Sequence, residues 1–246
     1  MTKTIYIDAK YNKEIKLSEE LINYLKKNNV ANLALFASAQ FLELEKATEQ
    51  LKQEGIRTIA TKTKRTEKPT QLLGCNIYHD NFDEDIIEGA EAILYIGDGT
   101  FHPKALLLSQ IKNLRVKSVI TFNPISRKVA VMTRDAIEEQ VTRIKRNIKL
   151  FANADTIGIL VSVKLGQQYL AEAKKLRDNL NSKGKKAYIF IDNNFTPAHF
   201  ENFSFIKAWV NSACPRIATD DIQNIRAPII NIRDAFEPEK ALEEMG

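Results

Sequence analysis

The chain has 246 residues, with 36 lysines and arginines against 31 aspartates and glutamates, a formal net charge of +5 and only two cysteines. This length is sufficient for one large domain or two small ones, each with its own core. No apolar segment is long enough to cross a bilayer, and the first residues lack the features of a signal peptide. We therefore expect a cytoplasmic protein without a membrane partner, whose two cysteines are reduced thiols, metal ligands or core residues.

The first half of the chain alternates between strand-like and helix-like segments. Strands are expected at residues 5–7, 33–36, 58–60, 92–96, 118–122 and 129–132. Helices are expected from Ser18, whose hydroxyl can cap the first turn, from about residue 40 to 54, and from near Pro103. Gly55 is the expected end of the second helix, because glycine adopts positive φ at little cost.

The second half continues the alternation. Helices are expected at residues 134–151 and 167–182, and strands at 157–161, 187–191, 206–210 and 228–232. Strands rich in β-branched residues and separated by helices predict parallel sheets covered on both faces. The predicted fold class is α/β, with two similar small domains at residues 1–133 and 134–246. Each would be a parallel sheet flanked by helices, with a cleft between the two.

Basic residues gather in three clusters, at residues 62–68, 143–149 and 183–186. Solvated helix faces and loops explain such clusters in most proteins, and a docking surface for an acidic partner or RNA is the alternative. No aromatic residues are interleaved with the basic ones as in a base-stacking platform. The sequence therefore argues against nucleic acid as the main ligand.

Two glycine-containing turns follow predicted strands, at the place where open parallel sheets bind ligands. In GDGTFHP, residues 97–103, the glycines let the backbone approach a ligand, and the helix that follows would direct its N-terminal amides at an anionic group. In SVKLGQ, residues 162–167, Lys164 and Gln167 have the chemistry to hold a carboxylate. A common glycine turn between strand and helix is the alternative for the first segment, and an ordinary capped turn with an exposed lysine is the alternative for the second.

Both cysteines lie where the chain leaves regular structure, in LLGCN (residues 72–76) and NSACPRIATDD (residues 211–221). Isolated cysteines are usually core residues. Pro215, however, removes an amide that a core strand would need, and Arg216 beside a thiol favours the thiolate that binds metals. The residues alone indicate a possible thiolate site between the two domains. His79, His102 and His199 are scattered, and each is more simply explained as structural.

These segments read, in chain order, LLGCN, YIGDGTFHPKAL, GILVSVKLGQQYL and VNSACPRIATDD. In this order and roughly this separation they resemble the diphthamide-synthesis family, which includes the 2-(3-amino-3-carboxypropyl)histidine synthases. The resemblance extends to IYIDAKY and LALFASAQFLELEKATEQLKQEGI, and so covers almost the whole chain. Val163 and Leu165 depart from it, since they stand where threonine and proline are expected.

The resemblance implies non-standard radical chemistry on S-adenosylmethionine at a 4Fe–4S cluster held by three cysteines, one from each of three similar α/β domains. An electron donor would start a reaction that transfers a 3-amino-3-carboxypropyl group to a histidine of translation elongation factor 2. Cys75 and Cys214 match the second and third cluster cysteines, and the Cys214 sulfur would point into a cavity shared by the domains. The residues that would line the S-adenosylmethionine site are Gly97, Asp98, Gly99, His102, Ser162, Lys164, Gln167 and Arg216.

The chain resembles the second and third domains of the family, without a counterpart of the first cluster cysteine. In one interpretation it is an enzyme whose third ligand comes from a partner chain, from a second copy of this chain or from His79. In another it is a non-catalytic, cluster-free subunit that binds a cofactor or a partner. In the last, the two cysteines hold a different cluster or form a redox pair. A homodimer would offer four thiolates, which on one cluster would leave no iron for S-adenosylmethionine.

Overall fold

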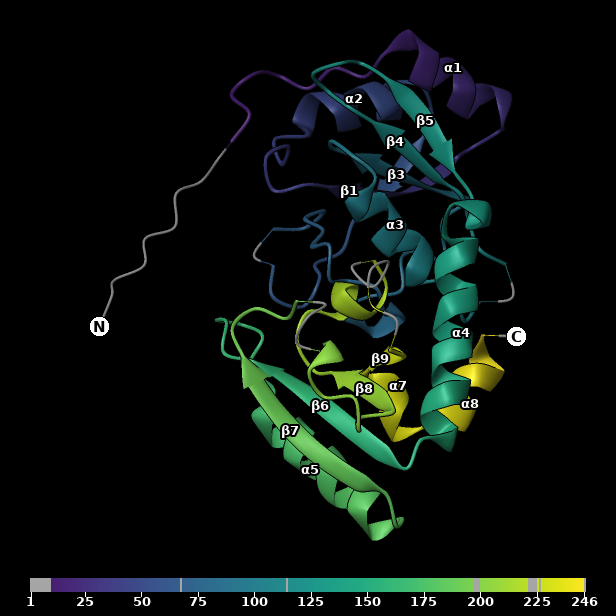
Figure 1. Ribbon diagram of the computed structural model, residues 1–246. Helices are drawn as coiled ribbons and strands as arrows, with labels where there is room; N and C mark the ends of the chain where they lie inside the picture. The colour runs from purple at the N-terminus through teal and green to yellow at the C-terminus, as the bar shows by residue number, and fades with distance from the viewer. Residues whose placement is uncertain are drawn as a thin grey trace. The chain divides into compact units, whose positions relative to one another are not determined.

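The computed structural model describes residues 10–66, 68–113, 115–196, 200–220, 225 and 227–245. The chain divides into two compact units, Met1–Ile137 and Glu138–Gly246, each with its own sheet and helices (Figure 1). The predicted α/β class is confirmed. The strand expected at residues 5–7 lies outside the described residues, and the cleft between the units stays a prediction. In the described part of the chain, no helix has the length and apolar character needed to span a membrane.

The first unit contains a sheet with strand order β2-β1-β3-β4-β5. Its strands are β1 (Asn32–Ala37), β2 (Arg57–Ile59), β3 (Ala92–Ile96), β4 (Val119–Phe122) and β5 (Val129–Met132). The expectation of a wholly parallel sheet is wrong at one edge, where β5 runs antiparallel to β4. Only six residues separate these two strands, so the connection is a hairpin and is too short for the crossover that parallel strands require. Asn123 closes it by donating to the carbonyl of Lys128 and accepting from the N–H of Arg127.

The helices of the first unit begin and end for local reasons. They are α1 (Glu19–Lys27), α2 (Glu45–Gln53) and α3 (Phe101–Leu108), with short 3₁₀ helices η1 (His79–Asn81) and η2 (Arg134–Ile137). Ser18 caps α1 as expected, and Gly55 follows α2 with φ of +76°. The start predicted for α2 near residue 40 is wrong, because a turn in which Phe41 donates to the Ser38 carbonyl comes first. α3 begins two residues before Pro103.

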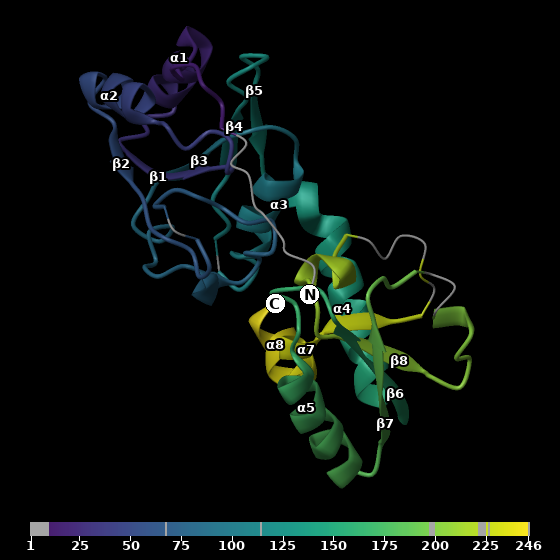
Figure 2. The ribbon, with the colours of Figure 1, turned by 90° about the vertical axis from the view of Figure 1, so that its left-hand side faces the viewer.

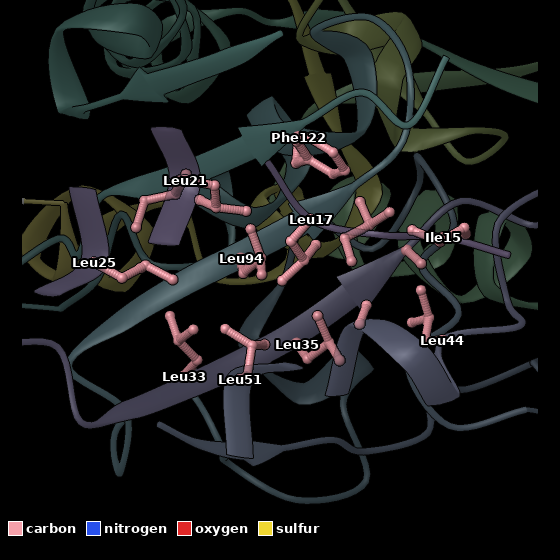
Figure 3. Close-up of a cluster of buried hydrophobic side chains, with 14 of the residues drawn as sticks. Ile15, Leu17, Leu21, Leu25, Leu33, Leu35, Leu44, Leu51, Leu94 and Phe122 are labelled. Atoms are coloured by element: carbon pink, nitrogen blue, oxygen red, sulfur yellow. The ribbon is translucent and has the colours of Figure 1, made fainter. Parts of the chain in front are cut away.

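One face of this sheet is covered by α1 and α2. Alternate residues of β1 and β3 point to the same face, so that Leu33, Leu35 and Leu94 meet leucines of the two helices in a single buried cluster (Figure 3). The opposite face carries Phe36 and Tyr95, which are also fully buried. Burial of both faces fixes the two central strands, and with them the positions of the loops that follow.

The second unit contains a wholly parallel sheet with strand order β7-β6-β8-β9, the same pattern as β2-β1-β3-β4. Its strands are β6 (Thr156–Ser162), β7 (Lys186–Asp192), β8 (Ala208–Asn211) and β9 (Ile229–Asn231). Its helices are α4 (Glu138–Asn153), α5 (Leu170–Ser182), α7 (Ile232–Phe236), α8 (Pro238–Glu244) and the 3₁₀ helix η3 (Pro215–Ala218). The helix predicted at 134–151 is η2 followed by α4, and α5 begins later than the predicted residue 167.

The two central strands of this sheet are held by an aromatic core. α5 packs along β6 and β7 (Figure 2). Trp209 of β8 is fully buried against Phe190 and Phe200, whose ring centroids lie 4.8 Å and 5.1 Å from its own. Gly158 admits this ring, because a Cβ at that position would lie 2.4 Å from the Trp209 side chain. β6 and β8 are thereby fixed side by side, and their carboxyl ends carry the candidate site residues of this unit.

Candidate functional site

In the first unit, the Cys75 segment begins directly beyond the carboxyl end of β1. The N–H of Ala37 donates to the carbonyl of Thr70 at 2.8 Å, and the N–H of Leu72 donates to the carbonyl of Ala37 at 2.9 Å. Ala37 is also the register partner of Ile96, the last residue of β3. The structure therefore brings the Cys75 turn and the Gly97 turn to the carboxyl edge of two adjacent strands.

The Cys75 turn is held by its neighbours. Asn76 is buried and accepts from the N–H of Leu73 at 2.8 Å, while its own N–H donates to the Leu73 carbonyl at 2.9 Å. Gly74 lies against the first residue of α3, since a Cβ there would stand 1.9 Å from the ring of Phe101. Cys75 itself is a free, partly exposed thiol. Its sulfur is therefore presented by a fixed turn.

The Gly97–His102 segment is ordered by its own side chains. Gly97 is buried, and a Cβ there would meet the Tyr95 hydroxyl at 2.4 Å. Asp98 accepts from the N–H of Gly99, which has φ of +67°, and from Asn123 Nδ2, both at 2.8 Å. His102 stacks on Tyr95 with ring centroids 5.9 Å apart. Burial raises the pKa of Tyr95 to about 12, so that the ring beneath His102 is a neutral phenol.

In the second unit, the Lys164 turn and the Cys214 turn follow two adjacent strands. Ser212 links them to the sheet, because its N–H and its hydroxyl both donate to the carbonyl of Leu160, at 3.1 Å and 2.6 Å. Ser162 is buried and accepts from the N–H of Lys164 at 3.1 Å. The N–H of Gln167 donates to the Lys164 carbonyl at 3.0 Å and so closes a turn after the strand. Lys164 is exposed in this turn.

Two buried asparagines build the Cys214 turn. Asn211, the last residue of β8, donates to the Cys214 carbonyl at 2.9 Å and accepts from the N–H of Ala213 at 3.0 Å. Its Nδ2 also donates to Asn231 Oδ1 at 2.8 Å, and Asn231 in turn donates to the carbonyl of Pro215 at 3.1 Å. The prediction that Cys214 lies in a turn after its strand is confirmed, and this cysteine is partly exposed and forms no disulfide.

Arg216 lies within η3, directly after the Cys214 turn. It is buried and forms an ion pair with Asp220, one helical turn further along the chain. The hydroxyl of Thr219 donates to the same carboxylate at 2.9 Å. The guanidinium therefore fixes the geometry of this segment. Asp221, the final residue of the quoted motif, lies outside the described residues.

Three polar side chains at these turns were not singled out by the sequence. Arg65 Nη2 lies 2.7 Å from the sulfur of Cys75, and Asn211 and Asn231 hold the Cys214 turn. In the sequence Arg65 is one member of a basic cluster, and a spacing of ten residues carries no signal of contact. Asn211 directly follows one predicted strand and Asn231 lies one residue before the end of another, and these positions are the only sequence feature that could have drawn attention to them.

His79 is held by a carboxylate. Its Nε2 lies 2.8 Å from Asp85 Oδ2. Burial opposes ionisation of Asp85, but hydrogen bonds from His79 and from the N–H of Glu88 outweigh it, so the pKa of Asp85 is lowered from 3.8. His199 lies outside the described residues. Among the residues that the structure describes, no group of three or more histidine, cysteine, aspartate or glutamate side chains is arranged to hold a metal ion.

Asp85→Asn is expected to lower the free energy of unfolding at about pH 7 by no more than about 1 kcal/mol, because the pair is partly exposed. The folded-state pKa of Asp85 lies below the unfolded value of 3.8. Its contribution is therefore present above that value and is lost as the pH falls through the folded-state pKa. Urea denaturation of both proteins at about pH 7 and at about pH 3 measures this difference. A difference that stays constant over this range would contradict the assignment.

A family model described as "Putative diphthamide synthesis protein" matches residues 1–244. The chain belongs to the diphthamide synthesis protein family. The 2-(3-amino-3-carboxypropyl)histidine synthase of Pyrococcus horikoshii is 28% identical over 221 residues, which are 89% of this chain and 60% of the relative. Subunit 1 of the Yarrowia lipolytica synthase is 33% identical over 153 residues, which are 61% of this chain and 32% of the relative. The chain thus covers less than two thirds of the length of each of these relatives.

The fold agrees with a solved member of the diphthamide synthesis protein family. The crystal structure of Dph2 from Pyrococcus horikoshii with a 4Fe-4S cluster superposes on this chain with a TM-score of 0.71 at 27% identity. The superposition covers 93% of this chain and 62% of the Dph2 chain. A second structure of Dph2 from the same organism gives a TM-score of 0.70. The family and the α/β architecture inferred from the sequence are both confirmed.

The two cysteines of this family member are the type of ligand that an iron–sulfur cluster requires. Both cysteines are outside any disulfide, partly exposed and fixed in turns, and thiolates are the ligands that such clusters use. Arg65 adds a hydrogen-bond donor at one of the two sulfurs. In number the set is incomplete, since the sequence has two cysteines and the described residues hold no group of three potential ligands. Any further cluster ligand must therefore come from outside this set.

Proposed function

We propose that this chain is a 2-(3-amino-3-carboxypropyl)histidine synthase component, which cleaves S-adenosylmethionine reductively and transfers its 3-amino-3-carboxypropyl group to a histidine of translation elongation factor 2. The observation that carries this proposal is the placement of both cysteines. Each lies outside any disulfide, is partly exposed, and is fixed in a turn beyond the carboxyl end of a central parallel strand. The family match over residues 1–244, and the 4Fe-4S cluster named for the Pyrococcus horikoshii structure, support it.

In this proposal Cys75 and Cys214 hold the cluster, which when bound supplies the electron that breaks a carbon–sulfur bond of S-adenosylmethionine. The exposed Lys164 and its neighbour Gln167 bind the carboxylate of S-adenosylmethionine. Arg216 and Ser162 fix the turns on which these groups stand. In the segment that contains Gly97, Asp98, Gly99 and His102, the backbone can approach S-adenosylmethionine closely, and the His102 imidazole is oriented by its stacking on Tyr95.

The remaining cluster ligand is proposed to come from a partner chain. Several relatives are named as subunit 1 of the synthase, which supports assembly from more than one chain. A second copy of this chain is the alternative source of the ligand. His79 is a weaker one, although its contact with Asp85 is of the kind that orients a metal-binding imidazole. The proposal also requires an electron donor and places the chain in the cytoplasm, where its substrate protein acts.

Anaerobic reconstitution with iron and sulfide tests the proposed function. We expect an electron paramagnetic resonance signal after reduction with dithionite, and a change in that signal when S-adenosylmethionine is added. Cleavage on the aminocarboxypropyl side of the sulfur leaves 5′-methylthioadenosine, which chromatography detects. A protein that stays colourless, with two free thiols per chain, would show that the chain alone is not the enzyme.

A non-catalytic role is the second candidate, and one observation favours it. The sequence contains two cysteines, whereas the resemblance to the family implies a cluster held by three. A cluster-free subunit would still bind a cofactor or a partner protein through the same turns. Under this alternative, Cys75→Ala and Cys214→Ala variants would fold and bind partners as the unmodified chain does, and neither would change the yield of the modified histidine.

A further inference from the structure

We infer that Arg65 is a positioning residue that donates a hydrogen bond to the sulfur of Cys75 and thereby raises the reduction potential of the cluster bound there. This inference rests on the proposed function. The direct observation is the distance of 2.7 Å between Arg65 Nη2 and Cys75 Sγ. A ligating cysteine sulfur carries negative charge, so a guanidinium that donates to it forms a charge-assisted hydrogen bond.

The backbone around Arg65 has an unusual conformation that neighbouring hydrogen bonds fix. Arg65 has φ of +76° and Thr70 has φ of +71°, a region that residues other than glycine rarely occupy. Such a conformation costs about 1–3 kcal/mol and persists where the surroundings determine it. The surroundings here include hydrogen bonds from the N–H of Lys64 to the Asn81 carbonyl at 2.8 Å and from the N–H of Asp83 to the Lys62 carbonyl at 3.0 Å.

The other partner is equally well fixed. Cys75 lies between Gly74, which packs against Phe101, and Asn76, which is buried and bonded to the backbone of Leu73. Donor and acceptor therefore stand on two separately anchored turns ten residues apart. An incidental surface contact between a flexible arginine and a thiol would not require a strained backbone on one side and a buried asparagine on the other.

The physical consequence concerns the electron that the cluster takes up. Reduction adds one electron from an external reductant and makes the cluster more negative, with no bond formed or broken and no proton transferred. Hydrogen bonds to the sulfurs and a nearby positive charge stabilise the more negative state. Arg65 therefore makes uptake of the electron by the cluster easier, and it makes transfer of that electron from the cluster to S-adenosylmethionine less favourable by the same amount.

Replacing Arg65 by asparagine tests the inference, because asparagine tolerates positive φ better than most residues and removes the guanidinium. We expect the midpoint potential of the reconstituted cluster to shift to more negative values in Arg65→Asn, and Arg65→Lys to restore part of the shift. Lys68→Asn is the matched control. It removes a cation from the same loop, and the Lys68 ammonium lies 3.4 Å from Glu43. Thermal denaturation confirms that all three variants are folded.

A second readout does not depend on the cluster. In a Cys214→Ser background, the rate at which iodoacetamide alkylates Cys75 at one fixed pH is expected to fall roughly tenfold in Arg65→Asn, the factor that corresponds to a hydrogen bond to a charged group. If no variant takes up a cluster but alkylation slows, the proposed function fails and the role of Arg65 at Cys75 stands. If clusters form and the midpoint potential is the same in all variants, the inference about Arg65 is overturned. Without a cluster, an unchanged alkylation rate overturns it equally.

Discussion

Replacing either cysteine by alanine is expected to abolish cluster binding and leave the fold intact. Cys75 and Cys214 are the only thiols in the chain, and iron–sulfur clusters are held mainly by cysteine thiolates. Both thiols are partly exposed, so that truncation opens no buried cavity and is expected to change the free energy of unfolding by about 1 kcal/mol or less. Iron per chain after anaerobic reconstitution, together with thermal denaturation, measures the two effects.

Serine variants at the same positions are the matched controls, since serine has the same side-chain shape as cysteine with a smaller oxygen in place of the sulfur. If iron content falls equally in the alanine and serine variants, ligation by the thiolate is the cause. Full iron content in either single variant would show that the corresponding cysteine is not a ligand, and would favour the non-catalytic interpretation. A redox pair would behave differently: oxidation of the unmodified chain would remove both free thiols at once, and either single variant would keep its remaining thiol.

The parts of the fold that depend on local pattern could be predicted from the sequence. β3 and β5 coincide with the predicted ranges, because short runs rich in β-branched residues between turns specify strands. Helix starts were less accurate. α2 and α5 begin later than expected because hydrogen-bonded turns at Ser38–Phe41 and Lys164–Gln167 take up the residues that follow each strand. A helical pattern shows which residues share a face, whereas the first turn depends on bonds that the pattern does not contain.

The direction of β5 and the surroundings of the cysteines depend on contacts that no short pattern encodes. The six-residue connection after β4 was visible, yet its positive φ at Arg127 and the closing bonds of Asn123 emerge only in the folded hairpin. Cys75 and Cys214 could be singled out as candidate ligands because each lies next to a glycine or a proline, where the chain leaves regular structure. Arg65 could not, because its contact with Cys75 depends on two turns that are folded separately and then brought together.

Asn211→Ala is expected to destabilise the second unit by about 2–4 kcal/mol, because it leaves the N–H of Ala213 and one acceptor of Asn231 without their partners in a buried position. The same change frees the carbonyl of Cys214 from its side-chain donor at 2.9 Å. The thiol should then no longer be presented in one orientation. Urea denaturation measures the stability, and iron per chain after reconstitution measures the site.

Asn147→Ala separates these two effects. Asn147 is as deeply buried as Asn211, and its amide donates to the carbonyl of Ile229 at 3.0 Å, at the opposite end of β9 from Asn231. Its loss should destabilise the same unit by a similar mechanism, with no bond to the Cys214 turn removed. We therefore expect iron uptake at moderate temperature to fall in Asn211→Ala and to be kept in Asn147→Ala. Equal iron uptake in two equally destabilised variants would mean that Asn211 supports only the sheet, and that Cys214 is held by η3 and Arg216 alone.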